Sequence, residues 1–282
     1  MNTAQLSNEE QIAMWNGAAG QAWVETQAAL DRLLEPFEHL LVEAVAARKA
    51  QRVLDVGCGT GATTLAVARR LRAQRACVGV DISEPMIALA RSRAERERAP
   101  ARFICADAQT HAFAPGSFDM IVSRFGVMFF ADSVRAFANL RRAATKGADM
   151  KLIAWRGPAD NPFMTTAERA AAPFLPELPA RQPDEPGQFA FADRDRVYGI
   201  LNESGWTEID IQPLDVGCTM PKSELLTYVS KLGPVGRALQ QVDERTHARV
   251  IDALRAAFAP YVHGAEVRFT AACWMIGARA AE

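Results

Sequence analysis

The sequence predicts an α/β fold with a doubly wound, mostly parallel sheet and helices on both of its faces. Two observations support this prediction. Five short apolar runs alternate with helical segments between residues 51 and 155, as expected for parallel strands joined by crossover helices. The glycine-rich stretch GCGTG follows the first run directly, and such turns occur where open parallel sheets bind ligands. The 282 residues are enough for one enlarged domain, or for one domain with a smaller cap.

The apolar runs are the expected strands, and they cover residues 53–57, 77–81, 101–107, 118–123 and 150–155. Three of the four connections between them are expected to be helical, because apolar residues recur at helical spacing in 62–74, 83–97 and 132–145. In the second of these helices, Ser83 is the expected N-cap and Pro85 lies in the first turn.

The segments on either side of this region predict a lid and a cap. About 45 N-terminal residues have the pattern of two amphipathic helices, and Pro36 is expected to kink or break the second. After residue 155 we expect a proline-interrupted region, a helix, a strand, a helical stretch and a last strand, at 157–192, 193–205, 207–216, 223–260 and 266–280.

Composition excludes several classes of function. The formal net charge is −1 and no long block of one sign occurs, which argues against a nucleic-acid partner. No run approaches the 18 to 20 apolar residues, roughly, that a membrane span needs, and no signal peptide is evident, so we expect a cytoplasmic protein. The four histidines lack metal-ligand spacing, so no metal site is expected. The five cysteines form no CxxC pair, which suits a reducing compartment: Cys58, Cys77, Cys105, Cys218 and Cys273.

The first strand and its turn read D-x-G-x-G-x-G, with Asp55 followed by Gly57, Gly59 and Gly61. The same stretch also matches the dinucleotide pattern ending in Ala62, so it leaves a nicotinamide cofactor open. Asp81 ends the second strand, where a carboxylate can accept hydrogen bonds from both ribose hydroxyls of an adenosine. That residue too would serve either cofactor.

The residues at the end of the third strand distinguish a nicotinamide cofactor from another adenosine-containing ligand. Asp107 can accept the adenine amino group while the backbone N–H of Ala108 meets the ring, and nicotinamide-binding domains do not usually need that acidic residue. Ile82 and Met86 are the expected apolar walls of the adenine site.

Four segments in this order resemble one known family. They are VLDVGCGTG, GVDIS, CADAQ and FDMIVSRFGVMFF, which begin at residues 53, 79, 105 and 118. The chain resembles class I S-adenosylmethionine-dependent methyltransferases, and among them the small-molecule group that looks like the quinone-biosynthesis C-methyltransferases. The resemblance implies seven strands, the last antiparallel and inserted near the sheet edge. It implies a lid at 1–48 and a cofactor-binding methyltransferase domain at 49–282, with cap insertions at about 157–192 and 217–264.

The resemblance also implies roles for the motif residues. Asp55, Gly57 and Gly59 would surround the methionine end of the cofactor, Asp81 the ribose, and Asp107 with Ala108 the adenine. Gly61 and Ser123 complete the expected cofactor site. S-adenosylhomocysteine would be the product.

Methyl transfer from a sulfonium is an in-line displacement, so the protein mainly positions the acceptor and excludes water. Arg124 leaves the fourth strand and is the candidate catalytic residue, pairing with an acidic substrate or with the carboxylate of the cofactor; a structural salt bridge is the alternative. The expected substrate pocket comprises Trp15, Trp23, Phe125, Met128 and Trp155.

We therefore expect methyl transfer to a small organic acceptor, with no signal for an oligomeric state. Two alternatives remain open: an NAD(P)-dependent oxidoreductase, and a non-catalytic S-adenosylmethionine-binding protein. The stretch DNPF (Asp160–Phe163) superficially resembles a signature of amino-group methyltransferases, but it follows the fifth strand and is expected to be a structural turn.

Overall fold

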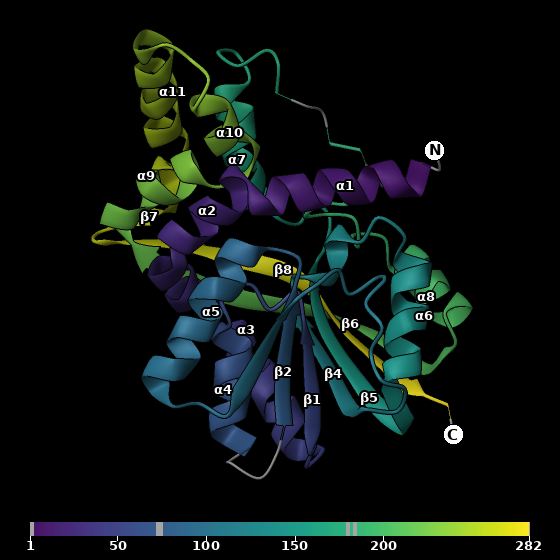
Figure 1. Ribbon diagram of the computed structural model, residues 1–282. Coiled ribbons are helices and arrows are strands. Elements are labelled where there is room, and N and C mark those ends of the chain that lie inside the picture. Colours follow the sequence, from purple (N-terminus) through teal and green to yellow (C-terminus); the bar gives the residue numbers. More distant parts are fainter. Residues whose placement is uncertain (1–2, 72–75, 179–180, 183–184, 282) are drawn as a thin grey trace.

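The computed structural model describes residues 3–71, 76–178, 181–182 and 185–281. One sheet organises them, with strand order β3-β2-β1-β4-β5-β8-β6 and the two-residue β7 paired to β8 (Figure 1). Strands β1 to β5 run parallel, and β8 lies antiparallel between β5 and β6. The strands are β1 (Arg52–Val56), β2 (Ala76–Asp81), β3 (Ala101–Cys105), β4 (Phe118–Arg124), β5 (Ala144–Trp155), β6 (Trp206–Pro221), β7 (Val262–His263) and β8 (Glu266–Ala280).

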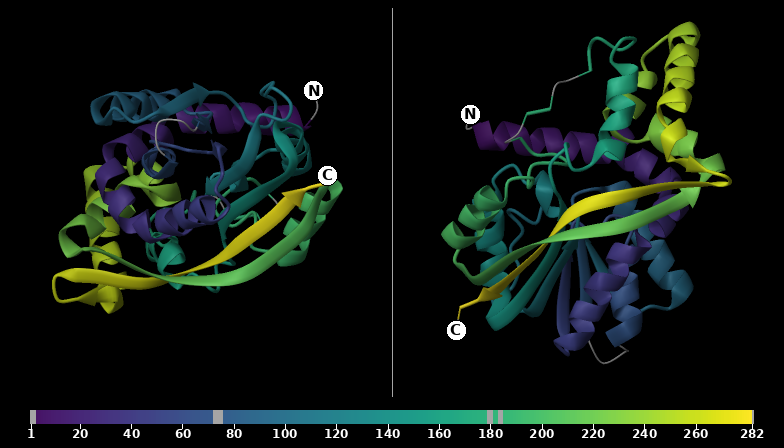
Figure 2. Two further views of the ribbon diagram at one scale, coloured as in Figure 1. Left: turned by 90° about the horizontal axis from the view of Figure 1, so that it is seen from below. Right: turned by 180° about the vertical axis from the view of Figure 1, so that it is seen from behind.

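This architecture confirms the predicted fold class, including the closing antiparallel strand. Four of the five residues of β1 are buried, as expected for a central parallel strand covered on both faces. The edge strand β6 instead alternates exposed and buried positions. It continues to Pro221, five residues beyond its expected end, and pairs with β8 in a long antiparallel ladder that reaches beneath the cap (Figure 2).

Helices cover both faces of the sheet. On one side lie α3 (Gln27–Ala47), α4 (Ala62–Leu71) and α5 (Glu84–Glu97), and on the other α6 (Ser133–Ala143) and α8 (Arg194–Glu203) (Figure 1). The predicted end of the helix after β1, residues 72–74, lies outside the described residues. The connection from β3 to β4 carries no helix, as expected.

The N-terminal prediction of two helices is wrong, because three are present: α1 (Thr3–Asn16), α2 (Ala18–Glu25) and α3. Pro36 lies inside α3 and does not end it. Phe37, Leu41 and Val45 are fully buried against the sheet, and we attribute the continuity of the helix to this packing, which outweighs the hydrogen bond that a proline removes.

A cap covers the carboxyl ends of the parallel strands. It contains α7 (Pro162–Ala171), α9 (Lys222–Lys231), α10 (Gly233–Leu239) and α11 (Glu244–Ala257), which confirms the predicted helical stretch. Short 3-10 turns occur at η1 (Val127–Phe129) and η2 (Ala259–Tyr261). Helices α1 and α2 cross the same edge of the sheet below the cap (Figures 1 and 2). No described helix is long and apolar enough to cross a membrane.

The packing of α3 predicts a large difference between neighbouring apolar residues. Phe37 is 0% exposed and its ring meets those of Phe125 and Trp155 at 5.0 and 6.4 Å between centroids, whereas Leu40 is 37% exposed. Phe37→Ala should lower the free energy of unfolding by about 3–5 kcal/mol and Leu40→Ala by less than about 1 kcal/mol. Urea denaturation would check this, and similar losses in both variants would show that α3 is not part of the core.

Candidate functional site

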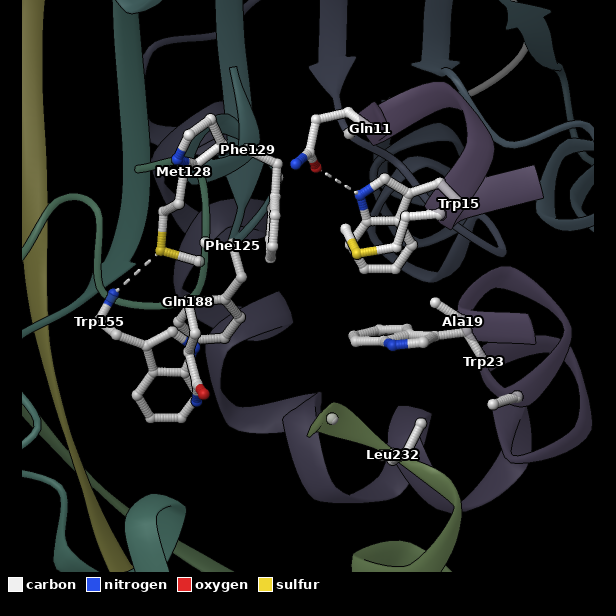
Figure 3. Close-up of a pocket in the computed structure, with 18 of the residues that line it drawn as sticks. Gln11, Trp15, Ala19, Trp23, Phe125, Met128, Phe129, Trp155, Gln188 and Leu232 are labelled. Atoms are coloured by element: carbon white, nitrogen blue, oxygen red, sulfur yellow. Dashed lines mark hydrogen bonds between the residues drawn. The ribbon is translucent and has the colours of Figure 1, made fainter. Parts of the chain in front are cut away.

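A cavity of about 430 Å³ lies between the carboxyl edge of the sheet, the helices α1 and α2, and the cap. Trp15 and Trp23 face it from the N-terminal helices, and Phe125, Met128 and Trp155 face it from the opposite side (Figure 3). The ends of β1, β2 and β3 supply Gly57, Gly59, Asp81, Ile82, Asp107 and Ala108 to its wall, and Met86 comes from α5. Thus most of the predicted site residues, although far apart in the sequence, meet in one cavity.

The three glycines of the first turn occupy different surroundings. Gly59 lines the cavity, and a Cβ there would meet only the Met86 sulfur, at 3.7 Å, so its backbone is open to a ligand. Gly57 packs against Gly126, and a Cβ on Gly57 would lie 2.5 Å from the Gly126 Cα. Gly61 does not line the cavity, because it packs against the Phe103 ring.

Asp81 is buried and uses its carboxylate to hold two loops. One oxygen accepts the Ser83 N–H at 2.9 Å and the other the Gly59 N–H at 2.8 Å. Burial raises the pKa of Asp81 above its usual value, and these backbone hydrogen bonds oppose the rise. The carboxylate therefore joins the glycine turn to the start of α5 at the cavity wall.

The prediction of Ser83 as the N-cap residue of α5 is confirmed, although its side chain makes no capping hydrogen bond. Its hydroxyl donates instead to the Trp15 carbonyl at 2.6 Å. The Asn16 side-chain oxygen accepts a hydrogen bond from the Glu84 N–H at 2.9 Å. The N-terminal segment thus supplies an acceptor for a backbone N–H in the first turn of α5. A Cβ on Gly20 would lie 1.9 Å from the Trp15 carbonyl oxygen and 2.9 Å from the Ser83 hydroxyl, so glycine permits the close approach of α2 to both groups.

Asp107 also contacts the N-terminal helices. One carboxylate oxygen accepts the Gln109 N–H at 2.9 Å. The other accepts the Thr110 hydroxyl at 2.8 Å and the Asn8 side-chain amide at 3.0 Å. The position expected to bind an adenine amino group is thus bonded to an amide N–H₂ from α1.

Asp55 and Ser123 lie behind the cavity wall. The Thr64 hydroxyl donates to Asp55 at 2.6 Å, and burial raises the pKa of Asp55 to about 7, with the Arg124 guanidinium opposing the rise. The Ser123 hydroxyl donates to the Val56 carbonyl at 2.7 Å and accepts the Gly126 N–H at 3.2 Å. Both residues support the β1 and β4 loops from within and do not line the cavity.

Arg124 lines the cavity and donates to the Leu34 carbonyl at 3.2 Å. Burial lowers the pKa of its guanidinium, and the carboxylates of Glu38, Asp31 and Asp55 oppose that change. No ion pair joins Arg124 to a described residue, so the predicted structural salt bridge is absent from this part of the chain. Its charge nevertheless faces several carboxylates on the sheet side.

Aromatic rings form the opposite walls. Phe125 has a backbone φ of +62°, which is strained for a bulky residue, and its ring stacks on Trp155 at 4.6 Å and 12°. The Met128 sulfur accepts a hydrogen bond from the backbone N–H of Trp155 at 3.5 Å. Across the cavity, Trp15 meets Trp23 and Phe129 edge-on at 6.2 and 5.0 Å (Figure 3).

Known proteins resemble this chain in sequence and fold. A family model described as a methyltransferase domain matches residues 53–147. The chain is 26% identical over 217 residues to a demethylmenaquinone methyltransferase of Renibacterium salmoninarum, which covers 74% of this chain and 89% of the relative. It is 36% identical over 207 residues to the nocamycin O-methyltransferase of Saccharothrix syringae, covering 68% and 71%. The chain belongs to the S-adenosylmethionine-dependent methyltransferases.

Solved structures agree with the fold of this methyltransferase. The YcgJ protein of Bacillus subtilis superposes with a TM-score of 0.57 at 18% identity, covering 87% of this chain and 98% of that one. A geranyl diphosphate methyltransferase in complex with S-adenosylmethionine gives 0.52 at 16% identity, covering 90% and 88%. The enzyme transfers a methyl group from S-adenosylmethionine to a small molecule, and neither the oxidoreductase nor the non-catalytic alternative is favoured.

Sequence reasoning missed one support of the methyltransferase site. Arg93 lies in the charged part of α5, yet it is only 9% exposed. Its guanidinium donates to the Thr60 carbonyl at 2.8 Å and to Asp31 at 2.7 Å, and so holds the glycine turn against α3. A charge run on a helix carries no local signal for such a contact.

Two further features of the sequence are His111 and the DNPF stretch. His111 does not line the cavity. The DNPF stretch is structural, because the side chain of Asn161 bonds to both backbone groups of Ala272.

The approach of Gly57 to Gly126 predicts a steric effect on cofactor binding. A Cβ on Gly126 would lie 2.6 Å from the Gly57 Cα, so Gly126→Ala should displace the glycine turn and weaken S-adenosylhomocysteine binding by about tenfold or more. Gly199→Ala is the matched control, since no atom lies within 4 Å of the new Cβ. Calorimetric titration would check this, and unchanged affinity in a folded Gly126→Ala variant would contradict it.

The raised pKa of Asp55 predicts a pH dependence of stability. The carboxyl has a pKa of about 7 in the folded protein against 3.8 ordinarily, so folding favours its protonated form. The free energy of unfolding should therefore fall as pH rises from about 4 to 7, by an amount on the order of 4 kcal/mol. Asp55→Asn should remove this slope, whereas Asp195→Asn, at a 96% exposed side chain, should keep it. Parallel profiles for Asp55→Asn and wild type would refute the assignment.

Proposed function

We propose that S-adenosylmethionine binds along the carboxyl edge of β1, β2 and β3, and that the acceptor is a mainly apolar molecule held beneath the cap. One observation carries this proposal: the same cavity joins the open backbone of Gly59 and the carboxylate of Asp81 to the stacked rings of Phe125 and Trp155. Aromatic walls suit an apolar acceptor, while the polar edge suits a nucleoside.

The proposed cofactor contacts follow from the groups at that edge. Gly57 and Gly59 would lie against the methionine end, and Asp81 would accept hydrogen bonds from the ribose hydroxyls with its remaining lone pairs. Asp107 would exchange the Asn8 amide for the adenine amino group, a donor of the same kind. Ile82, Met86 and Ala108 would enclose the adenine ring.

We further propose that Arg124 pairs with the carboxylate of the cofactor. It lines the cavity near the glycine turn, and among the described residues its guanidinium donates a hydrogen bond only to the Leu34 carbonyl. Asp55, Gly61 and Ser123 would act from behind the wall by fixing the two loops. Each of these assignments gives the residue a positioning role.

The chemistry that the cofactor supplies is a methyl group on an electrophilic sulfonium. The protein must hold the acceptor in line with that methyl and exclude water, which in the best intramolecular analogies lowers barriers by about 7–11 kcal/mol. We propose that α1 and α2 form the lid and that the insertions at about 157–192 and 217–264 form the roof. The buried rings of Phe163 and Phe258 line the cavity from that roof.

The ribose assignment predicts a specific loss of affinity. Asp81→Ala should weaken S-adenosylhomocysteine binding by about tenfold or more, since one or two hydrogen bonds to a charged acceptor are lost. Asp119→Ala is a matched control, because Asp119 also accepts two backbone N–H groups, from Gln51 and Arg52, but at the opposite end of β1. Calorimetry should show near wild-type affinity in the control; equal affinity in Asp81→Ala would refute the assignment.

A further inference from the structure

The charged groups that line the cavity are almost all paired. Arg181, which lines the roof, donates two hydrogen bonds to Glu168, at 2.8 and 2.5 Å. Lys231 binds Glu25 of α2 at 2.6 Å. Each of these ion pairs neutralises the two charged groups that it joins.

The sheet side of the cavity is also compensated. Arg124 faces the carboxylates of Glu38, Asp31 and Asp55. The carboxylates of Asp81 and Asp107 accept the hydrogen bonds described above. Because Arg124 in this half of the cavity is the proposed partner of the cofactor carboxylate, it is not available to an anionic group of the acceptor.

Arg237 of α10 is different. It lines the cavity half-buried, and its guanidinium makes no hydrogen bond, ion pair or ring contact with any described residue. Among the residues that the structure describes, Glu168 is the carboxylate that acts on it, and Arg181 already neutralises Glu168. Burial lowers the pKa of this guanidinium, so it has lost part of its hydration without gaining a partner.

The part of the cavity wall that the cap forms, to which Arg237 belongs, is mainly apolar. Val235 of the same helix, Phe163 of α7, Tyr228 of α9 and Phe258 after α11 line the same cavity. In such surroundings a guanidinium favours an anion strongly, and its planar donors fit a carboxylate or sulfonate in bidentate geometry. We infer that the acceptor is a ring-containing, apolar molecule that carries one anionic group, and that Arg237 binds this group; the inference rests on the proposed acceptor site.

Two fluorescent probes test the inference. 8-Anilinonaphthalene-1-sulfonate and N-phenyl-1-naphthylamine share one ring system and differ by the sulfonate. Each probe is titrated into the protein saturated with S-adenosylhomocysteine. The Arg237→Gln substitution should weaken binding of the sulfonate probe by about tenfold or more, and binding of the neutral probe by less than about twofold. Arg237→Lys should fall between wild type and Arg237→Gln for the sulfonate.

A surface arginine provides the matched control. Arg255→Gln on α11, at a 64% exposed side chain, should change the affinity for neither probe. Failure of the sulfonate to bind the wild-type complex, an unchanged sulfonate affinity in Arg237→Gln, or an equal loss for both probes would overturn the inference.

Cofactor affinity separates this inference from the proposed function. Arg237→Gln should bind S-adenosylhomocysteine with wild-type affinity by calorimetry, because Arg237 belongs to the cap. If that affinity holds and the probes fail, only the anionic acceptor is refuted. If the wild-type protein does not bind S-adenosylhomocysteine, the proposed cofactor site fails, and the anionic acceptor that rests on it is refuted too.

Discussion

The site depends on a close contact between two backbone turns. Gly57, after β1, and Gly126, after β4, approach so closely that a side chain on either would clash with the other. The Ser123 hydroxyl secures the contact by bonding to both turns. Because the two strands are neighbours in the sheet, this contact fixes the glycine turn relative to the aromatic wall.

The same contact explains the strained conformation of Phe125. The residue directly before Gly126 has a positive φ, and its ring is held between Phe37 and Trp155. The buried face of α3 therefore supports the acceptor wall as well as the sheet. Strain of this kind persists only where surrounding packing determines it, and here three separate elements of the chain contribute.

The ends of the parallel strands were predictable because their chemistry is local. Asp81 and Asp107 follow apolar runs, and parallel strands bring their carboxyl ends to one edge, so the sequence predicted that these residues would meet. Helix number was less predictable at the N-terminus, because the segment before α3 is divided at Gly17 into α1 and α2. The continuity of α3 was also not predictable, since Pro36 normally argues for a break and packing against the sheet overrides it. The role of Arg93 was not predictable, because its partners, Thr60 and Asp31, are distant in the sequence.

By itself, the sequence determined the fold class, the family and the sheet edge that forms the site, since these follow from periodicity and from motifs at strand ends. Tertiary structure decided which motif residues face the cavity: Gly59 and Asp81 line it, whereas Asp55 and Gly61 lie behind its wall. It also decided the charge balance of the roof, where Glu168 is bound by Arg181 and Arg237 has no partner among the described residues. The physical reason is that burial and ion pairing depend on which distant segments pack together, and a linear motif does not contain that information.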